Sequence, residues 1–157
     1  MLTSNDLERF IAAEMIAATL VWPGVPTPTV LDAAAALRVA PAQIIKSVLF
    51  MADGEPVLVV ASGLAKISSK LLADYLGLAR RRVRVALGEK VTAVTGYIPG
   101  SVPPFGHMQP LTTVLEDEVL TLMGDIYGGG GDLDALLRLS LAELRRVVGE
   151  KTAVLVE

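Results

Sequence analysis

The sequence predicts a single α+β domain over residues 1–157, built on a curved, mixed β-sheet with helices around it. Three observations predict this class. A chain of 157 residues, 52% hydrophobic and 20% charged, has material for one well-buried core but hardly for two. The candidate strands are short and interleave irregularly with helical segments, without the regular alternation of strand and helix that a parallel sheet requires. No repeat, low-complexity stretch or linker divides the chain.

The N-terminal third is predicted to hold two helices and one short strand. Asn5 and Glu8 have the spacing of a capping box ahead of an apolar stripe, which places the first helix, and residues 18–21 follow as a strand. Three prolines and a glycine make residues 22–28 a rigid, non-helical connection. A second helix then begins near Thr29 and ends before the next proline.

The middle of the chain begins with a predicted β-hairpin. Residues 44–51 and 56–61 are rich in β-branched and large apolar side chains, and Asp53-Gly54 marks a tight turn between them. Capping residues predict three further helices: one from Ser68 or Ser69 to Gly77, one at 88–94, and one that begins with a capping box of Ser140 and Glu143. Short apolar patterns predict further strands at residues 83–85, 112–116, 125–127, 135–139 and 152–156.

Composition excludes several classes of function. The chain has no cysteine and one histidine, so it offers no disulfide, no thiolate nucleophile and little for a zinc cluster. Glycines and prolines interrupt the long charge-free run of residues 91–115, so no membrane span is expected there. The first residues lack the basic start and apolar run of a secretory signal, which favours a cytoplasmic protein without a membrane partner.

Charge is distributed unevenly along the chain. A net charge of −3 disfavours a general binder of nucleic acid, DNA included. However, Arg80, Arg81, Arg82 and Arg84 supply four of the 14 cationic residues within five positions. This segment is either a local basic patch or a solvated turn after a helix.

Lys46 is the most informative single residue because it interrupts a strand that is otherwise apolar. By alternation it shares a face with Val48 and Phe50. An amine withdrawn from water needs an anionic or hydrogen-bonding partner, so such a lysine often marks a binding site. The alternative is a lysine at a strand end whose amine reaches solvent.

Two glycine-rich segments could bring backbone close to a ligand. In the loop 95–106, glycines allow close approach and prolines restrict the backbone, so amide N–H groups could be held ready for a ligand oxygen. A structural long turn is the alternative. The run Gly128–Gly131 lacks the spacing of the nucleotide-binding motifs but could approach a ribose or phosphate, unless it is only a flexible hairpin turn.

Other polar residues are not expected to carry chemistry. His107 has no serine nucleophile elbow or acidic partner at a recognisable spacing, and we expect it at the surface. The carboxylates Glu116, Asp117 and Glu118 are expected to be solvated rather than to bind a cation. No metal and no cofactor is predicted.

Taken in order, the segments 44–49, 95–106 and 127–131 resemble the YbaK/ProX family of trans-editing aminoacyl-tRNA deacylases. This family is similar to the editing domain inserted in bacterial prolyl-tRNA synthetases, and the resemblance covers roughly residues 29–148. It implies a lysine on a central strand at the substrate pocket and a Gly-x-x-x-Pro loop beside it. Lys46 matches the lysine, and Gly100 and Pro104 match the loop. It also implies a pocket that works without metal, with attack by positioned water or by groups of the substrate.

The resemblance yields a set of candidate site residues. Lys46 and Gly100 are expected to be catalytic: the lysine would hold the substrate and loop amides would stabilise the oxyanion. The expected substrate-binding residues are Gly96, Ser101, Pro103, Pro104, Gly128, Gly129 and Gly130.

The expected substrate is the 3′ acceptor end of mischarged aminoacyl-tRNA, with a small side chain such as alanine or cysteine on tRNA for proline. An aminoacyl-tRNA synthetase is a candidate partner. Residues 22–26 depart from the family, because many relatives carry polar residues there, including histidine. Two alternatives remain open: a non-catalytic module that binds aminoacyl-tRNA, a nucleotide or a protein, and a hydrolase of another small ester or amide with Lys46 as base.

Overall fold

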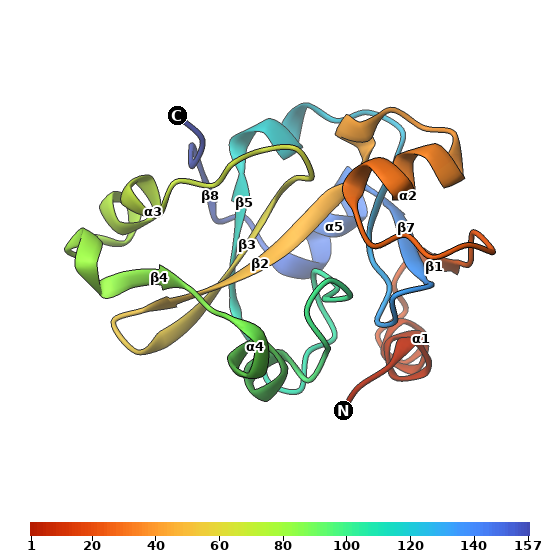
Figure 1. Ribbon diagram of the computed structural model, residues 1–157, viewed down its shortest axis with the longest axis horizontal. Coiled ribbons are helices and arrows are strands. Elements are labelled where there is room, and N and C mark those ends of the chain that lie inside the picture. The colour runs from red at the N-terminus through yellow and green to blue at the C-terminus, as the bar shows by residue number, and fades with distance from the viewer.

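Two β-sheets form the framework of the protein in a computed structural model that describes all residues 1–157 (Figure 1). The larger sheet has the strand order β4-β2-β3-β5-β8, and the smaller has the order β1-β7-β6. The strands are β1 (Ala18–Val21), β2 (Ile45–Ala52), β3 (Glu55–Ser62), β4 (Val83–Val85), β5 (Thr112–Glu116), β6 (Asp125–Gly129), β7 (Leu136–Ser140) and β8 (Thr152–Ala153).

The predicted α+β class is confirmed, and the sheet is mixed. Strands β3, β5 and β8 pair in parallel, whereas β2 pairs antiparallel with both β3 and β4. The strands divide between two sheets rather than forming one curved sheet. A single parallel bridge between Ile44 and Tyr127 is the only ladder contact that joins them, so the start of β2 lies at the junction.

The β2–β3 hairpin forms as predicted. Its register pairs Lys46 with Ala61 and Ala52 with Glu55. Asp53 and Gly54 have φ values of 50° and 83°, the left-handed pair that a tight two-residue turn between twisted strands requires. This hairpin fixes which face of the larger sheet each β2 side chain occupies.

Five helices cover the two sheets. They are α1 (Ser4–Ala13), α2 (Val30–Leu37), α3 (Ser69–Leu76), α4 (Gly88–Thr95) and α5 (Leu141–Val148). Helix α3 packs Leu72 against Phe50 and Val59, while α4 packs Val91 against Leu49 and Leu58. Because neighbouring strand residues point to opposite faces, α3 and α4 cover opposite faces of the larger sheet.

Helices α1 and α5 pack on the smaller sheet. Leu7 of α1 and Leu144 of α5 are fully buried with Ile126 of β6 and Leu137 of β7. Figure 1 shows this half of the molecule beside α2, with α3 and the C-terminus at the far end of the larger sheet. No helix is long and apolar enough to cross a membrane.

The helix caps follow the sequence closely, with one correction. Ser68 accepts a hydrogen bond from the Leu71 N–H, and Gly77 ends the same helix in the left-handed conformation. The capping box of α1 is formed by Thr3 and Asp6, not by Asn5 and Glu8. Both pairs have the same spacing, but Thr3 is the residue with extended backbone ahead of the helix.

The acidic run after β5 also differs from the prediction. Glu116 is 1% exposed, and its two carboxylate oxygens accept the N–H groups of Glu118 and Leu155, each at 2.8 Å. The expectation that this carboxylate is solvated is therefore wrong. The predicted strand 152–156 is also shorter, because the Leu155 N–H is bonded to Glu116 instead of to a strand.

Candidate functional site

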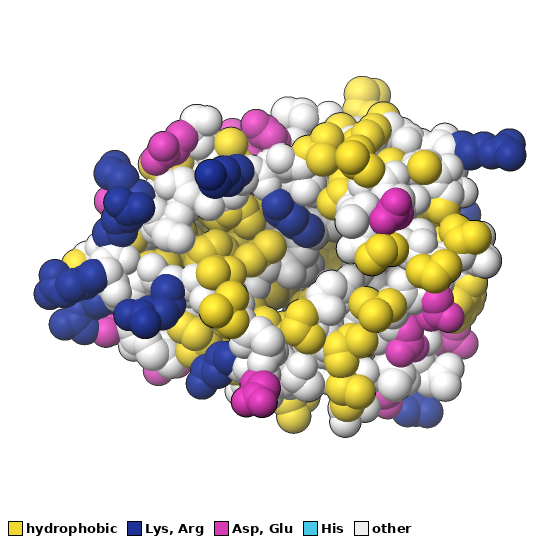
Figure 2. Space-filling view, in the orientation of Figure 1, with side chains coloured by type: hydrophobic (Ala, Val, Ile, Leu, Met, Phe, Trp, Pro, Cys, Tyr) yellow, Lys and Arg dark blue, Asp and Glu magenta, His cyan; other side chains and the backbone are white.

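A small cavity lies where the two sheets meet. Its volume is about 180 Å³. Figure 2 shows that the surface on this side of the molecule is hollowed near its centre. The segment before α2, the start of β2, the loop after α4 and the glycines of β6 contribute its walls. The lining residues are Thr27, Pro28, Thr29, Val30, Ala33, Ile44, Ile45, Lys46, Ser47, Gly100, Val102, Gly128, Gly129 and Leu136.

Lys46 places an amine at this cavity without an acidic partner. The side chain is half-buried, its Nζ donates a hydrogen bond to the Ala65 carbonyl oxygen, and it forms no salt bridge. Burial lowers the pKa of Lys46 below its ordinary value. An ammonium has three donors, so two remain available. The amine does not extend freely into solvent, and a ligand oxygen or anion at the cavity would find an uncompensated charge.

Gly100 and Val102, which also line this cavity, carry backbone N–H groups without partners. Gly100 has φ 88°, a value that favours glycine, and it lies within the turn that is closed by the hydrogen bond from the Ser101 N–H to the Ile98 carbonyl. The N–H groups of Gly100 and Val102 make no backbone hydrogen bond within the chain. Both residues line the cavity, so their donors are free for a ligand.

The glycines of β6 allow this loop to pack directly on the strand. A Cβ atom at Gly129 would lie 2.2 Å from the Val102 carbonyl oxygen, which is too close for any side chain. Gly128 faces Ile45 of β2, and the Gly131 N–H donates to the Ser101 carbonyl at 2.9 Å. The run is therefore part strand and part hairpin turn, because Gly130 and Gly131 begin the connection between β6 and β7. Gly128 and Gly129 lie within β6 and line the cavity together with Lys46, Gly100 and Val102.

Five of the predicted substrate-binding residues do not line this cavity. These residues, which are Gly96, Ser101, Pro103, Pro104 and Gly130, stabilise the surrounding loops instead. Gly96 ends α4 against Leu2, and the buried Ser101 hydroxyl donates a hydrogen bond to the Ile98 carbonyl. The Pro103 carbonyl contacts His107, Pro104 packs beside Gly128, and Gly130 packs against Ala135. The structure thus brings Lys46, Gly100, Gly128 and Gly129 together.

His107 was expected at the surface, and that expectation is wrong. It is half-buried, its Nε2 lies 2.7 Å from the Pro103 carbonyl oxygen, and its ring meets Tyr97 edge-on. Burial lowers the pKa of His107. The Tyr97 hydroxyl in turn donates to the Gly106 carbonyl at 2.9 Å. The pair holds the shape of the loop that carries Gly100.

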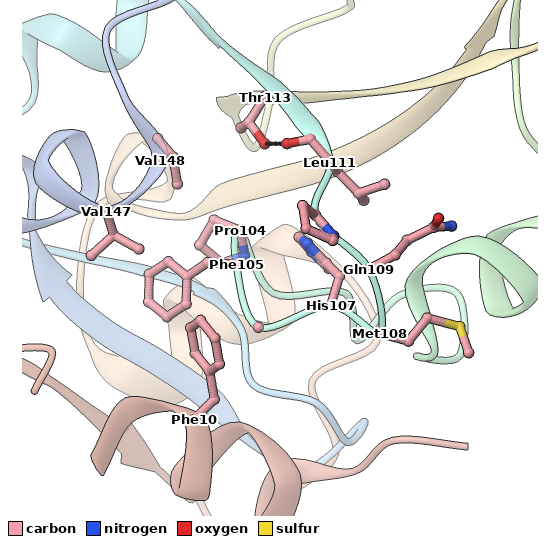
Figure 3. A pocket seen from close by; sticks show the side chains of 12 residues that line it. Phe10, Pro104, Phe105, His107, Met108, Gln109, Leu111, Thr113, Val147 and Val148 are labelled. Carbon is pink, nitrogen blue, oxygen red and sulfur yellow. Dashed lines mark hydrogen bonds between the residues drawn. The ribbon is translucent and has the colours of Figure 1, made fainter. Parts of the chain in front are cut away.

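A second, larger cavity of about 340 Å³ lies on the other side of this loop (Figure 3). The rings of Phe10 and Phe105 stack in it with centroids 6.1 Å apart, next to Val147 and Val148 of α5. Its polar side chains already have partners in the backbone: His107 contacts Pro103, Gln109 donates to Val94, and Thr113 donates to Leu111. Each of these side chains is thus anchored by one hydrogen bond to the backbone, and no Lys, Arg, Asp or Glu lines this cavity.

Thr27 is the site residue that sequence reasoning missed. Its Oγ1 is buried, has no hydrogen-bond partner and belongs to a residue that lines the smaller cavity. A buried hydroxyl without a partner is uncommon and unfavourable, so this group is available for a hydrogen bond with a water molecule or a ligand in the cavity. The available signal was a lone polar residue between Pro26 and Pro28 in a backbone that cannot rearrange easily.

Residues 25–147 match the family described as Aminoacyl-tRNA editing domain. The chain belongs to the aminoacyl-tRNA editing domain family. This editing domain is 36% identical over 146 residues to the proline–tRNA ligase of Solidesulfovibrio magneticus, covering 92% of this chain and 24% of the ligase. It is 33% identical over 104 residues to the proline–tRNA ligase of Streptococcus equi subsp. equi, covering 66% of this chain and 16% of the ligase. The editing domain thus spans a quarter or less of these relatives.

Solved structures of similar length share the whole fold. A crystal structure of a candidate trans-editing enzyme for prolyl-tRNA synthetase is 27% identical, with a TM-score of 0.88, covering 98% of this editing domain and 96% of that chain. A crystal structure of a hypothetical protein is 31% identical, also with a TM-score of 0.88, covering 97% of this chain and 99% of that one. The likeness supports a single domain that extends over both sheets.

Proposed function

We propose that this editing domain hydrolyses the ester of mischarged aminoacyl-tRNA, with the aminoacyl group in the cavity at the sheet junction. The observation that carries the proposal is that donors with unused hydrogen-bonding capacity line the same cavity. The Lys46 ammonium, the Thr27 hydroxyl and the Gly100 N–H line one cavity from three separate segments. An aminoacyl ester offers carbonyl and ribose oxygens for such donors, and it develops negative charge during hydrolysis.

The chemistry needs positioning more than a strong base. A water molecule attacks the carbonyl carbon and loses a proton, which forms a tetrahedral intermediate with a negative oxygen. The bond to the ribose oxygen then breaks, and that oxygen takes a proton, releasing amino acid and tRNA. In this proposal the N–H groups of Gly100 and Val102 stabilise the oxyanion, and Lys46 holds the substrate through its charge. Each oxyanion donor contributes on the order of 3 kcal/mol.

The size of the cavity supports a small amino acid. At about 180 Å³ it is smaller than the roughly 300–1,000 Å³ typical of drug-sized ligands. The walls at Val30, Ile45 and Leu136 are apolar. We propose alanine or cysteine on tRNA for proline, because two relatives are proline–tRNA ligases. A cavity of this size would exclude larger amino-acid side chains, which would protect many correctly charged tRNAs from hydrolysis. We place the activity in the cytoplasm, where a synthetase supplies the mischarged product.

A panel of charged tRNAs tests this proposal. We expect wild type to hydrolyse alanyl- or cysteinyl-tRNA for proline well above the spontaneous rate. We expect the rate of hydrolysis by Lys46→Ala to be at least tenfold lower than that of wild type. Lys151→Ala is the matched control, since Lys151 is an exposed lysine that does not line the cavity. If the folded wild type accelerates no member of the panel, the enzyme proposal fails and a non-catalytic binding module takes its place.

A further inference from the structure

The cavity at the sheet junction contains one cation and no carboxylate. Of its 14 lining residues, Lys46 alone is charged, because none of the others is Asp, Glu, Lys, Arg or His. Burial lowers the pKa of Lys46, and no acidic neighbour opposes this effect. Asp32 is next to the lining residue Ala33 along the chain, but the Asp32 side chain is exposed and does not line the cavity. The charge of Lys46 is therefore uncompensated inside the cavity.

The cavity presents strong hydrogen-bond donors and only neutral acceptors. After its bond to a backbone carbonyl, the Lys46 ammonium retains two protons for a ligand. The N–H groups of Gly100 and Val102 make no backbone hydrogen bond. The side-chain acceptors are hydroxyls, those of Thr27, Thr29 and Ser47. The lining therefore suits oxygen atoms of a ligand and offers no negative charge to an ammonium group.

An aminoacyl ester carries a cation next to its reacting carbonyl. The α-amino nitrogen is about 2.5 Å from the carbonyl carbon, so it follows that carbon into the cavity. An α-amino group with a pKa of about 7.7–8.0 is mostly protonated at neutral pH. A sphere of about 180 Å³ is about 7 Å across, so this ammonium would lie within about 7 Å of the Lys46 ammonium. At an effective dielectric constant of about 20, their repulsion weakens binding on the order of tenfold to a hundredfold.

A hydroxyl in place of the α-amino group removes this repulsion. It is neutral, it has nearly the same size, and it can both accept and donate a hydrogen bond. Its oxygen can accept from the Lys46 ammonium, and its proton can be donated to the unpaired Oγ1 of Thr27. The cavity is therefore more complementary to a 2-hydroxyacyl group than to the aminoacyl group of the same size.

We propose that this cavity accepts small 2-hydroxyacyl esters of the terminal tRNA ribose in preference to charged aminoacyl esters, and that lactyl-tRNA is hydrolysed there. The proposal rests on the proposed editing function for the ester and the RNA. Water adds to the lactyl carbonyl carbon and loses a proton, the bond from this carbon to the ribose oxygen breaks, and that oxygen takes a proton. The products are lactic acid, which ionises to lactate, and uncharged tRNA, so water is the one co-reactant.

Two esters that differ only at the α substituent test the proposal at one pH. They are alanyl-tRNA for proline and the lactyl-tRNA made from it by deamination with nitrous acid. Rates are expressed relative to spontaneous hydrolysis of each ester, because the two esters differ in intrinsic lability. We expect the KM for lactyl-tRNA to be about tenfold or more lower, with a rate enhancement at saturation of the same order. A KM equal to or above that for alanyl-tRNA overturns the proposal. Hydrolysis of alanyl-tRNA without hydrolysis of lactyl-tRNA also overturns it.

A binding measurement separates this preference from the editing function. The lactyl and alanyl amides of 3′-amino-3′-deoxyadenosine, which are stable to hydrolysis, are titrated by calorimetry into wild type, Lys46→Met and Asp32→Asn. We expect wild type to bind the lactyl amide about tenfold or more tightly than the alanyl amide. Lys46→Met keeps the length of the side chain without its charge and should lose most of this difference. Asp32→Asn removes an exposed carboxylate outside the cavity and should keep the difference.

The binding results have separate consequences for the two proposals. Preference for the lactyl amide without hydrolysis of either ester supports the cavity's preference and contradicts the editing function. Equal affinity of wild type for the two amides, tighter binding of the alanyl amide, or no binding of either overturns the preference even if alanyl-tRNA is hydrolysed. An undiminished difference in Lys46→Met overturns it as well. So does a selective loss of alanyl amide affinity in Asp32→Asn, because that carboxylate would then bind the ammonium.

Discussion

Among single residues, Lys46 is central to the proposed site, because its amine is partly desolvated and its hydrogen-bond partner is a carbonyl oxygen. A cation in that state can act through its charge or, once neutral, as a base. The two roles require opposite protonation states, so they respond to pH in opposite directions. Sequence alone placed the lysine beside the candidate site but left this choice open.

The pH dependence of deacylation distinguishes the two roles. Burial lowers the pKa of Lys46, so its ammonium is lost at a lower pH than that of an ordinary lysine. If charge is what matters, the ratio of catalysed to spontaneous hydrolysis falls as pH rises through that lowered pKa. Lys46→Arg, which stays charged, should shift this fall to higher pH. A ratio that rises over the same range contradicts the charge role and favours the base.

Thr27→Val removes the orphaned hydroxyl while keeping the shape of the side chain. Because the buried oxygen has no partner in the free protein, we expect the free energy of unfolding to stay the same or rise by about 1 kcal/mol. We expect kcat/KM for alanyl-tRNA to fall about tenfold, since the substrate loses a hydrogen bond. Thr19→Val, at an exposed position on β1, is the control. Unchanged kinetics in Thr27→Val would remove Thr27 from the site.

At the scale of elements, the contact between β6 and the loop after α4 shapes the cavity. A Cβ at Gly129 would meet backbone oxygens of Val102 and Ser101, whereas one at Gly128 would meet the side chain of Ile45 at 3.2 Å. Gly129→Ala should therefore cost about 2–4 kcal/mol of unfolding free energy and most of the activity. Gly128→Ala should cost clearly less stability, because a side chain can shift. Equal urea midpoints for the two variants would contradict this difference.

Glu116 joins three segments through a single carboxylate. It ends β5, caps the short 3-10 turn Asp117–Thr121 and holds the chain at Leu155. Glu116→Ala leaves two N–H groups without acceptors and should cost about 3 kcal/mol in urea unfolding. Glu116→Gln should also destabilise, since its amide NH₂ must face one of those N–H groups. Glu118→Ala, at an exposed position, should change stability by less than about 0.5 kcal/mol.

At the scale of the whole molecule, local features were predictable and distant contacts were not. The hairpin turn at Asp53-Gly54 and the cap at Ser68 depend on neighbouring residues, so the sequence contains the whole signal. The burial of Glu116 depends on Leu155, 39 residues later, and nothing near Glu116 predicts it. The division into two sheets likewise depends on where Ile44 meets Tyr127.

The candidate site shows the same division. The resemblance identified Lys46 and Gly100, and the structure places both at one cavity with Gly128 and Gly129. The resemblance could not distinguish Lys46 and Gly100, which line the cavity, from Gly96 and Ser101, which do not. The contacts of Gly96 with Leu2 and of Ser101 with Ile98 arise only in the folded chain. Thr27 was missed because an unpaired hydroxyl is a property of the fold. Motif residues can support a site without lining it.

The most direct test asks where the aminoacyl end of the substrate binds. Assigned backbone amide signals of wild type would be followed by NMR during titration with a stable amide analogue of alanyl-adenosine. The account predicts the largest shifts at Gly100, Val102, Gly128 and Gly129, which line the smaller cavity. Shifts centred on Phe10, Phe105 and Val148, around the larger cavity, would contradict it.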